Sequence, residues 1–165
     1  MRKTPVLITL LCFVALTTKA WGQSNQKPGL WEMTSTMSWQ KSPMPAGMTM
    51  PGGGPHTTQV CLTKELIDKY GTPPPQSRNN QCQMSNIVKK GNGMSADWVC
   101  SGPMAGKGTV EATWTDPDHS TSKVHFSGSM QAGPNAMPVE YTIDSTSVFK
   151  GADCGSVKPI TIPKE

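Results

Sequence analysis

Three methionines and a histidine stand close together in the sequence, and their side chains are suited to binding a soft metal ion. Met44, Met48 and Met50 supply thioether sulfur and His56 supplies an imidazole, ligand types that suit Cu(I) and Ag(I). The stretch 41–56 around them is dense in proline and glycine and has no periodicity, which predicts a long, flexible loop. The alternative is that a chain with 11 methionines folds a few of them over a sheet.

A second group with chemical potential is the set of aromatic residues on the predicted apolar face. Its members are Trp31, Trp39, Trp98, Trp114, Phe126 and Phe149. If the sheet that carries them curls without closing tightly, they can line a pocket for a lipid, a quinone or another small apolar ligand. The alternative is ordinary core packing, because every small β domain must bury such residues.

The sequence offers little support for an enzyme. Its three histidines are accompanied by no nucleophile elbow, zinc-protease motif or glycine-rich phosphate loop. Asp116 and Asp118 flank Pro117, which is typical of a turn rather than of paired catalytic carboxylates. We therefore expect a protein that binds something without transforming it, and we expect no cofactor.

The N-terminus predicts export. Arg2 and Lys3 precede an apolar run from Val6 to Leu16 that is too short to span a bilayer, and Ala20 and Gly22 supply the small residues of a cleavage site. We expect residues 1–22 to be a signal peptide, residues 23–165 to form a single domain in the periplasm or outside the cell, and no transmembrane segment to remain. Removal of three cations lowers the formal net charge from +4 to +1, which argues against nucleic-acid binding.

Four cysteines follow the predicted signal peptide: Cys61, Cys82, Cys100 and Cys154. An even number in an exported chain predicts two disulfides, whereas a four-thiolate zinc site usually shows Cys-x-x-Cys spacings that are absent here. Three pairings are possible. We favour Cys61 with Cys82 and Cys100 with Cys154, because the first closes a helical excursion and the second ties the last strand to the sheet. The main alternative joins Cys82 to Cys100 across a hairpin.

Alternation of apolar and polar residues predicts a mainly β fold. The expected strands are Leu30–Trp39, Thr57–Leu62, Cys82–Val88, Met94–Cys100, Gly108–Thr115, Thr121–Gln131 and Val139–Lys150. Thr63 is expected to cap one short helix that runs to Tyr70 and carries Leu66, Ile67 and Tyr70 inward. These elements predict an antiparallel up-and-down meander of about seven strands, curled into a barrel-like or strongly bent sheet.

The glycines and asparagine of 89–93 predict a hairpin loop between the third and fourth strands. With Gly91 at the apex, Cys82 and Val88 lie opposite Cys100 and Met94, and the apolar residues of both strands share one face.

Five short motifs lie in a characteristic order along the chain: residues 27–33 (KPGLWEM), residues 60–63 (VCLT), the isolated Cys82, residues 100–102 (CSG) and residues 151–154 (GADC). In these motifs the chain resembles a bacterial family grouped as domain of unknown function 3617. The resemblance covers about the whole chain after the predicted signal peptide, and it implies a small exported protein with no assigned biochemical function. We therefore expect a binding or interaction module whose partner is an unknown protein or a small apolar ligand, with the loop 41–56 as a contact element.

Overall fold

The computed structural model describes residues 26–44, 54–74, 82–132 and 135–160. In chain order its elements are β1 (Gly29–Lys41), β2 (His56–Leu62), α1 (Lys64–Tyr70), β3 (Cys82–Lys90), β4 (Gly93–Cys100), β5 (Met104–Asp116), β6 (His119–Ala132) and β7 (Asn135–Gly151). Within these ranges, seven antiparallel strands form one sheet with the order β2-β1-β7-β6-β5-β4-β3. The predicted mainly β fold with one short helix is confirmed.

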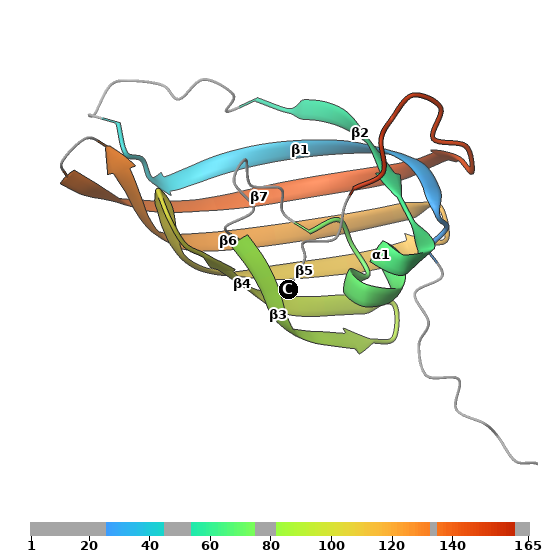
Figure 1. The fold of residues 1–165 in the computed structure, drawn as a ribbon, viewed down its shortest axis with the longest axis horizontal. Helices are drawn as coiled ribbons and strands as arrows, with labels where there is room; N and C mark the ends of the chain where they lie inside the picture. The colour runs from blue at the N-terminus through green and yellow to red at the C-terminus, as the bar shows by residue number, and fades with distance from the viewer. Residues whose placement is uncertain (1–25, 45–53, 75–81, 133–134, 161–165) are drawn as a thin grey trace, which may run out of the picture.

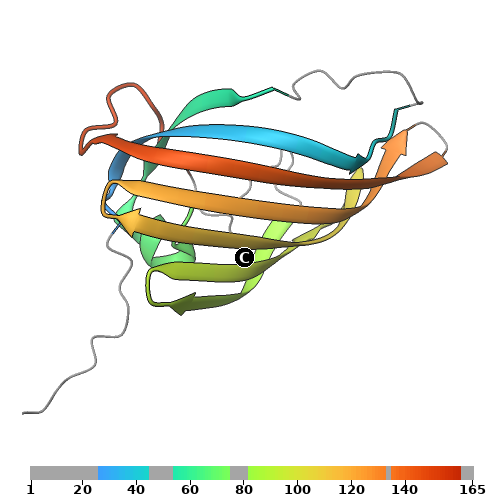
Figure 2. The ribbon, with the colours of Figure 1, turned by 180° about the vertical axis from the view of Figure 1, so that it is seen from behind.

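The strand order shows which strands form the two edges of the sheet. Strands β3 to β7 form a meander between sequence neighbours, and β1 then joins β7 and brings β2 to the outside. The strands β2 and β3 follow each other in the chain, yet they lie at opposite edges. The sheet is therefore open and strongly bent, with α1 on its concave side (Figure 1) and a continuous surface of strands behind (Figure 2).

Glycines allow the backbones of β5 and β6 to approach closely where the sheet curves. A Cβ atom built on Gly108 would lie 2.1 Å from the carbonyl oxygen of His125, and one on Gly128 would lie 2.2 Å from that of Ala105. A Cβ on Gly106 would lie 2.7 Å from Cζ of Phe126, whose ring covers this position. Glycine within a strand is typical of sites where another backbone or a ring must come this near.

The hairpin of β3 and β4 confirms half of the predicted register and corrects the rest. Cys82 pairs with Cys100 as predicted, but Val88 pairs with Ser95 instead of Met94 and is 57% exposed. The reason is a two-residue turn, Gly91 (φ 58°) and Asn92, in place of the predicted five-residue loop centred on Gly91. A bulge at Asn86 (φ 50°) absorbs the extra residue of β3.

The helix forms as predicted and is anchored at both ends. Thr63 Oγ1 accepts a hydrogen bond from Leu66 N (3.2 Å), and Gly71 ends the helix in the left-handed conformation (φ 73°). Leu66, Ile67 and Tyr70 are buried against β1 and β2. Lys89 of β3 donates hydrogen bonds to the carbonyl oxygens of Ile67 and Asp68. The helix therefore connects the two open edges of the sheet.

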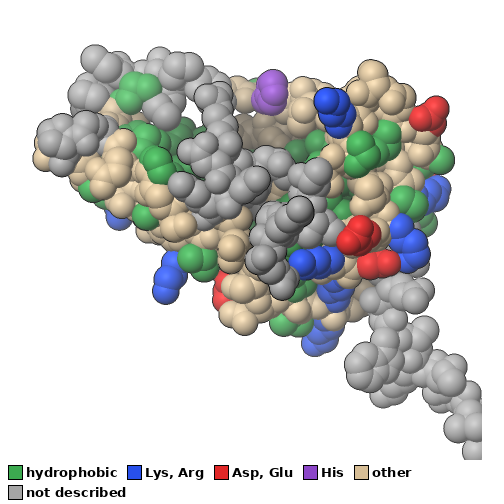
Figure 3. All heavy atoms as spheres, in the orientation of Figure 1, with side chains coloured by type: hydrophobic (Ala, Val, Ile, Leu, Met, Phe, Trp, Pro, Cys, Tyr) green, Lys and Arg blue, Asp and Glu red, His purple; other side chains and the backbone are tan. Residues whose placement is uncertain are grey.

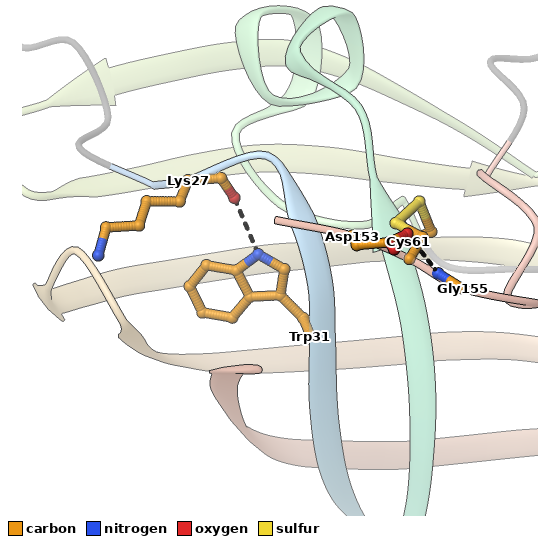
Figure 4. The surroundings of a disulfide bond; sticks show 6 residues. Lys27, Trp31, Cys61, Asp153 and Gly155 are labelled. Atoms are coloured by element: carbon orange, nitrogen blue, oxygen red, sulfur yellow. Dashed lines mark hydrogen bonds between the residues drawn. A yellow bond between two sulfur atoms is a disulfide. The ribbon is translucent and has the colours of Figure 1, made fainter. Parts of the chain in front are cut away.

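The disulfides join Cys61 to Cys154 and Cys82 to Cys100, so the pairing that we favoured is wrong and the alternative across the hairpin is correct. Cys61 and Cys82 lie on β2 and β3, at opposite edges of the sheet, and each is bonded to another cysteine. Cys154 reaches β2 because the chain after β7 returns beside it, where Ile160 N donates to Cys61 O (3.2 Å). Figure 4 shows this disulfide beside Trp31.

Candidate ligand-binding site

The structure leaves the methionine loop largely untested. Met48 and Met50 lie outside the described residues. Met44 is half-buried, and His56 is exposed at the first residue of β2, opposite Ser35 of β1. The described ranges contain no group of three or more His, Cys, Asp or Glu residues placed to hold a metal ion. Because the four cysteines of the described residues form disulfides, the alternative zinc site is wrong, whereas copper binding by the loop stays a prediction.

The six predicted aromatic residues all lie on the concave side, but they divide into separate groups. Trp31 and Phe149 pack edge to face (5.5 Å between ring centroids) in the cluster beneath α1. Trp114 also lies near the helix, because a Cβ built on Gly71 would be 3.3 Å from its ring. The remaining three, Trp39, Trp98 and Phe126, gather near the opposite end of the sheet.

A fourth ring, Tyr141, joins these three into a continuous group that we call the aromatic ladder (Trp39, Trp98, Phe126 and Tyr141). The ring centroids of Tyr141 and Trp39 are 5.2 Å apart, and Tyr141 stacks on Phe126 at 5.1 Å. Trp98 lies 5.3 Å from Phe126 and 6.5 Å from Tyr141. The sequence analysis missed Tyr141 as a site residue, although the alternation in residues 139–150 could have indicated it.

The border of the aromatic ladder is only partly buried. Trp39 itself is half-buried, and the partly buried apolar residues packed against this cluster include Met37, Met84, Met104, Met130 and Ile143. Hydrophobic side chains are visible at this end of the concave side, away from α1 (Figure 3). Methionine side chains are flexible and adapt to ligands of varied shape.

Polar groups within the ladder are few and are hydrogen-bond donors. The indole Nε1 of Trp98 is buried and has no acceptor within hydrogen-bonding distance among the described residues. The indole of Trp31, in contrast, donates to the carbonyl oxygen of Lys27 (2.9 Å; Figure 4). Burial raises the pKa of Tyr141 to about 12, because the phenolate would lose its hydration, so the hydroxyl stays neutral at physiological pH.

Charged side chains of the neighbouring strand positions lie on the convex face. Glu140, next to Tyr141, accepts from Lys41 Nζ (3.1 Å) and lies 3.5 Å from His125 Nε2. The hydrogen bond from Lys41 lowers the pKa of Glu140. Since successive side chains of a strand point to opposite faces, these charges stand behind the aromatic ladder rather than within it.

On β1, β6 and β7, a band of serines lies between the ladder and the helix end of the concave face, whereas the apolar core continues across β4 and β5 to Trp114. Its members lie at inward positions of β1, β6 and β7: Ser35, Ser120, Ser122, Ser145 and Ser147. Ser35 Oγ and Ser145 Oγ are 2.8 Å apart, and Ser145 is buried while the others are half-buried. The sequence analysis did not predict this band, because serine at an inward position weakens the alternation from which strand faces are assigned.

The other polar groups that we considered fit structural roles. Asp116 Oδ1 accepts from Asp118 N (2.7 Å), and its carboxylate also contacts His119 Nδ1 (2.9 Å). These hydrogen bonds lower the pKa of Asp116, and the one from the Asp118 backbone has the largest effect. They also stabilise the turn between β5 and β6. In the described ranges, no helix is long and apolar enough to cross a membrane.

The fold and the site define a class of small, disulfide-linked antiparallel β protein with an aromatic concave face. A family model described as protein of unknown function (DUF3617) matches residues 26–154, and the chain belongs to this family. The resemblance seen in the sequence is thereby confirmed. Neither the curated proteins nor the solved structures contain a match to the chain.

Proposed function

We propose that this is an exported, non-enzymatic protein that binds a small apolar ligand on the concave face of its sheet. The observation that carries the proposal is the half-buried apolar border of the aromatic ladder, in particular Met37, Trp39 and Ile143. A folded domain normally covers such a surface, since burying apolar area contributes roughly 25 cal/mol per Å². A ligand seated there would supply the missing cover.

Two further features support a ligand over a solid core. The strand order leaves the sheet open, and the serine band places small polar side chains where a packed core has large apolar ones. Apolar walls with a few polar groups are the usual lining of small-molecule sites. Export remains part of the proposal and is supported by the two disulfides, which persist in oxidising compartments, and by the N-terminal sequence.

A pair of lysine substitutions on neighbouring residues of β1 tests the proposal. Met37 faces the concave side, whereas Ser38 is exposed on the other face. Binding of the uncharged fluorescent probe N-phenyl-1-naphthylamine is expected to be saturable in the natural protein and unchanged in Ser38→Lys. In Met37→Lys the affinity should fall by about tenfold or more, because a charge then enters an apolar site.

Equal binding by both variants would place the probe elsewhere on the surface, and a lack of saturable binding to the natural protein would refute the proposed function. Thermal unfolding of both variants shows whether each is folded at the assay temperature.

A further inference from the structure

The buried indole of Trp98 indicates what kind of ligand the site would bind, because no described residue offers an acceptor to its N–H. Trp98 is 4% exposed, and its neighbours in the aromatic ladder are the rings of Phe126 and Tyr141. A buried donor without an acceptor costs roughly 1–3 kcal/mol. Buried donors in folded proteins usually have an acceptor, so a bound ligand is a candidate acceptor for this N–H.

A flexible side chain, that of Met84, lies next to Trp98 at the edge of the sheet. Trp98 lies on β4, and Met84 of the edge strand β3 is its partner in the register. Met84 is half-buried and packs against both hydrophobic clusters. Because a thioether chain changes rotamer easily, a ligand can displace it and reach the indole without moving a strand.

The electrostatics of the site select against a charged ligand. The described residues of this core cluster and its partly buried border are uncharged, and the ion pairs of Glu140 lie on the other face of the sheet. An ionised carboxylate or ammonium group would therefore enter an apolar site without a counter-charge, which is strongly unfavourable. The three polar groups of the aromatic ladder, the indoles of Trp39 and Trp98 and the neutral hydroxyl of Tyr141, can all donate.

We propose that the ligand is an uncharged apolar molecule with a carbonyl oxygen, which accepts a hydrogen bond from Trp98 Nε1 while the rest of the molecule packs on Trp39, Phe126 and Tyr141. This inference rests on the proposed function and narrows it to a chemical class. Both a quinone ring and a fatty ester present this chemistry.

Two matched pairs of probes test the ligand's chemistry. One pair tests the contribution of the carbonyl groups, and the other tests the effect of charge on a fatty acyl chain. Menadione and 2-methylnaphthalene share a fused ring system but differ in the two carbonyl groups. Methyl decanoate and the decanoate anion share an acyl chain but differ in charge. Dissociation constants are measured by equilibrium dialysis on protein purified from cells that produce the full chain.

The natural protein should bind menadione about fivefold more tightly than 2-methylnaphthalene, and methyl decanoate at least tenfold more tightly than decanoate, as expected for one hydrogen bond and one unpaired charge respectively. A lower dissociation constant for menadione would indicate a quinone as the ligand, and a lower one for methyl decanoate would indicate a fatty ester.

Two tryptophan variants test the role of the indole. Trp98→Phe should lower the preference for menadione over 2-methylnaphthalene to twofold or less, whatever the loss of overall affinity. Trp114→Phe is the matched control, because Trp114 also has a buried Nε1 without an acceptor among the described residues but lies beside Gly71 near the helix. The preference should remain about fivefold there.

Three results would overturn the inference: equal affinity for menadione and 2-methylnaphthalene in the natural protein, an unchanged preference in Trp98→Phe, or tighter binding of decanoate than of its ester. In each case apolar binding persists and the proposed function stands. If neither these four probes nor N-phenyl-1-naphthylamine binds, the proposed function fails together with the inference. If only N-phenyl-1-naphthylamine binds, the inference alone fails.

Discussion

Removal of one disulfide at a time should destabilise the protein to different extents. Cys61 and Cys154 are 93 residues apart in the chain, whereas Cys82 and Cys100 are 18 apart. In the chain-entropy model these loops contribute about 4.7 and about 3.2 kcal/mol to the free energy of unfolding. The double variant Cys61→Ala/Cys154→Ala should therefore lose about 1.5 kcal/mol more than Cys82→Ala/Cys100→Ala.

The two pairs are well matched for this comparison. Each contains one buried and one half-buried cysteine, so the packing lost on substitution by alanine is similar. Urea unfolding followed by tryptophan fluorescence measures the free energy of unfolding of each variant. Equal losses, or a larger loss for the hairpin pair, would contradict the reasoning. Peptide mapping without reduction should also recover these two pairings and no others.

Three further predictions follow from particular contacts. Gly108→Ala should destabilise the protein by about 2 kcal/mol or more in urea unfolding, because the new Cβ would overlap the carbonyl of His125. The control Gly54→Ala should be neutral, because no atom lies within 4 Å of its Cβ position, and similar stabilities of the two variants would contradict the prediction. The free energy of unfolding should fall as the pH rises from 10 to 12, since the folded state keeps the Tyr141 proton (pKa about 12) that the unfolded chain releases near 10. A Tyr141→Phe variant that loses as much stability as the natural protein over this pH range would refute this cause. Anaerobic titration should show Cu(I) binding that is lost when Met44, Met48 and Met50 are all changed to leucine, and unchanged affinity would dismiss copper as the ligand of the loop.

Local patterns in the sequence predicted most of the fold because they depend on neighbouring residues. Alternation and β-forming residues identified all seven described strands, and the cap at Thr63 located the start of the helix. The register of β3 and β4 was predicted correctly near Cys82, but it changed by one residue beyond Asn86. A left-handed asparagine in a bulge leaves no periodic signal, so this shift could not be predicted.

The disulfide pairing and the site depend on contacts between distant parts of the chain. The pairing of Cys61 with Cys154 requires β1 to lie between β2 and β7, and no local pattern specifies that order. The aromatic face was predicted, but its division into two groups was not, because the serines between them contribute no hydrophobic signal. The unpartnered indole of Trp98 is visible only when all the neighbouring side chains are in place.

Native mass spectrometry of the protein purified from its own cell envelope would show whether the concave face holds a ligand. We predict a co-purified uncharged molecule of low mass in the natural protein and in Ser38→Lys, and its absence in Met37→Lys. A mass equal to that of the polypeptide alone in the natural protein, under conditions that preserve a bound N-phenyl-1-naphthylamine probe, would contradict a ligand-binding role for the aromatic ladder.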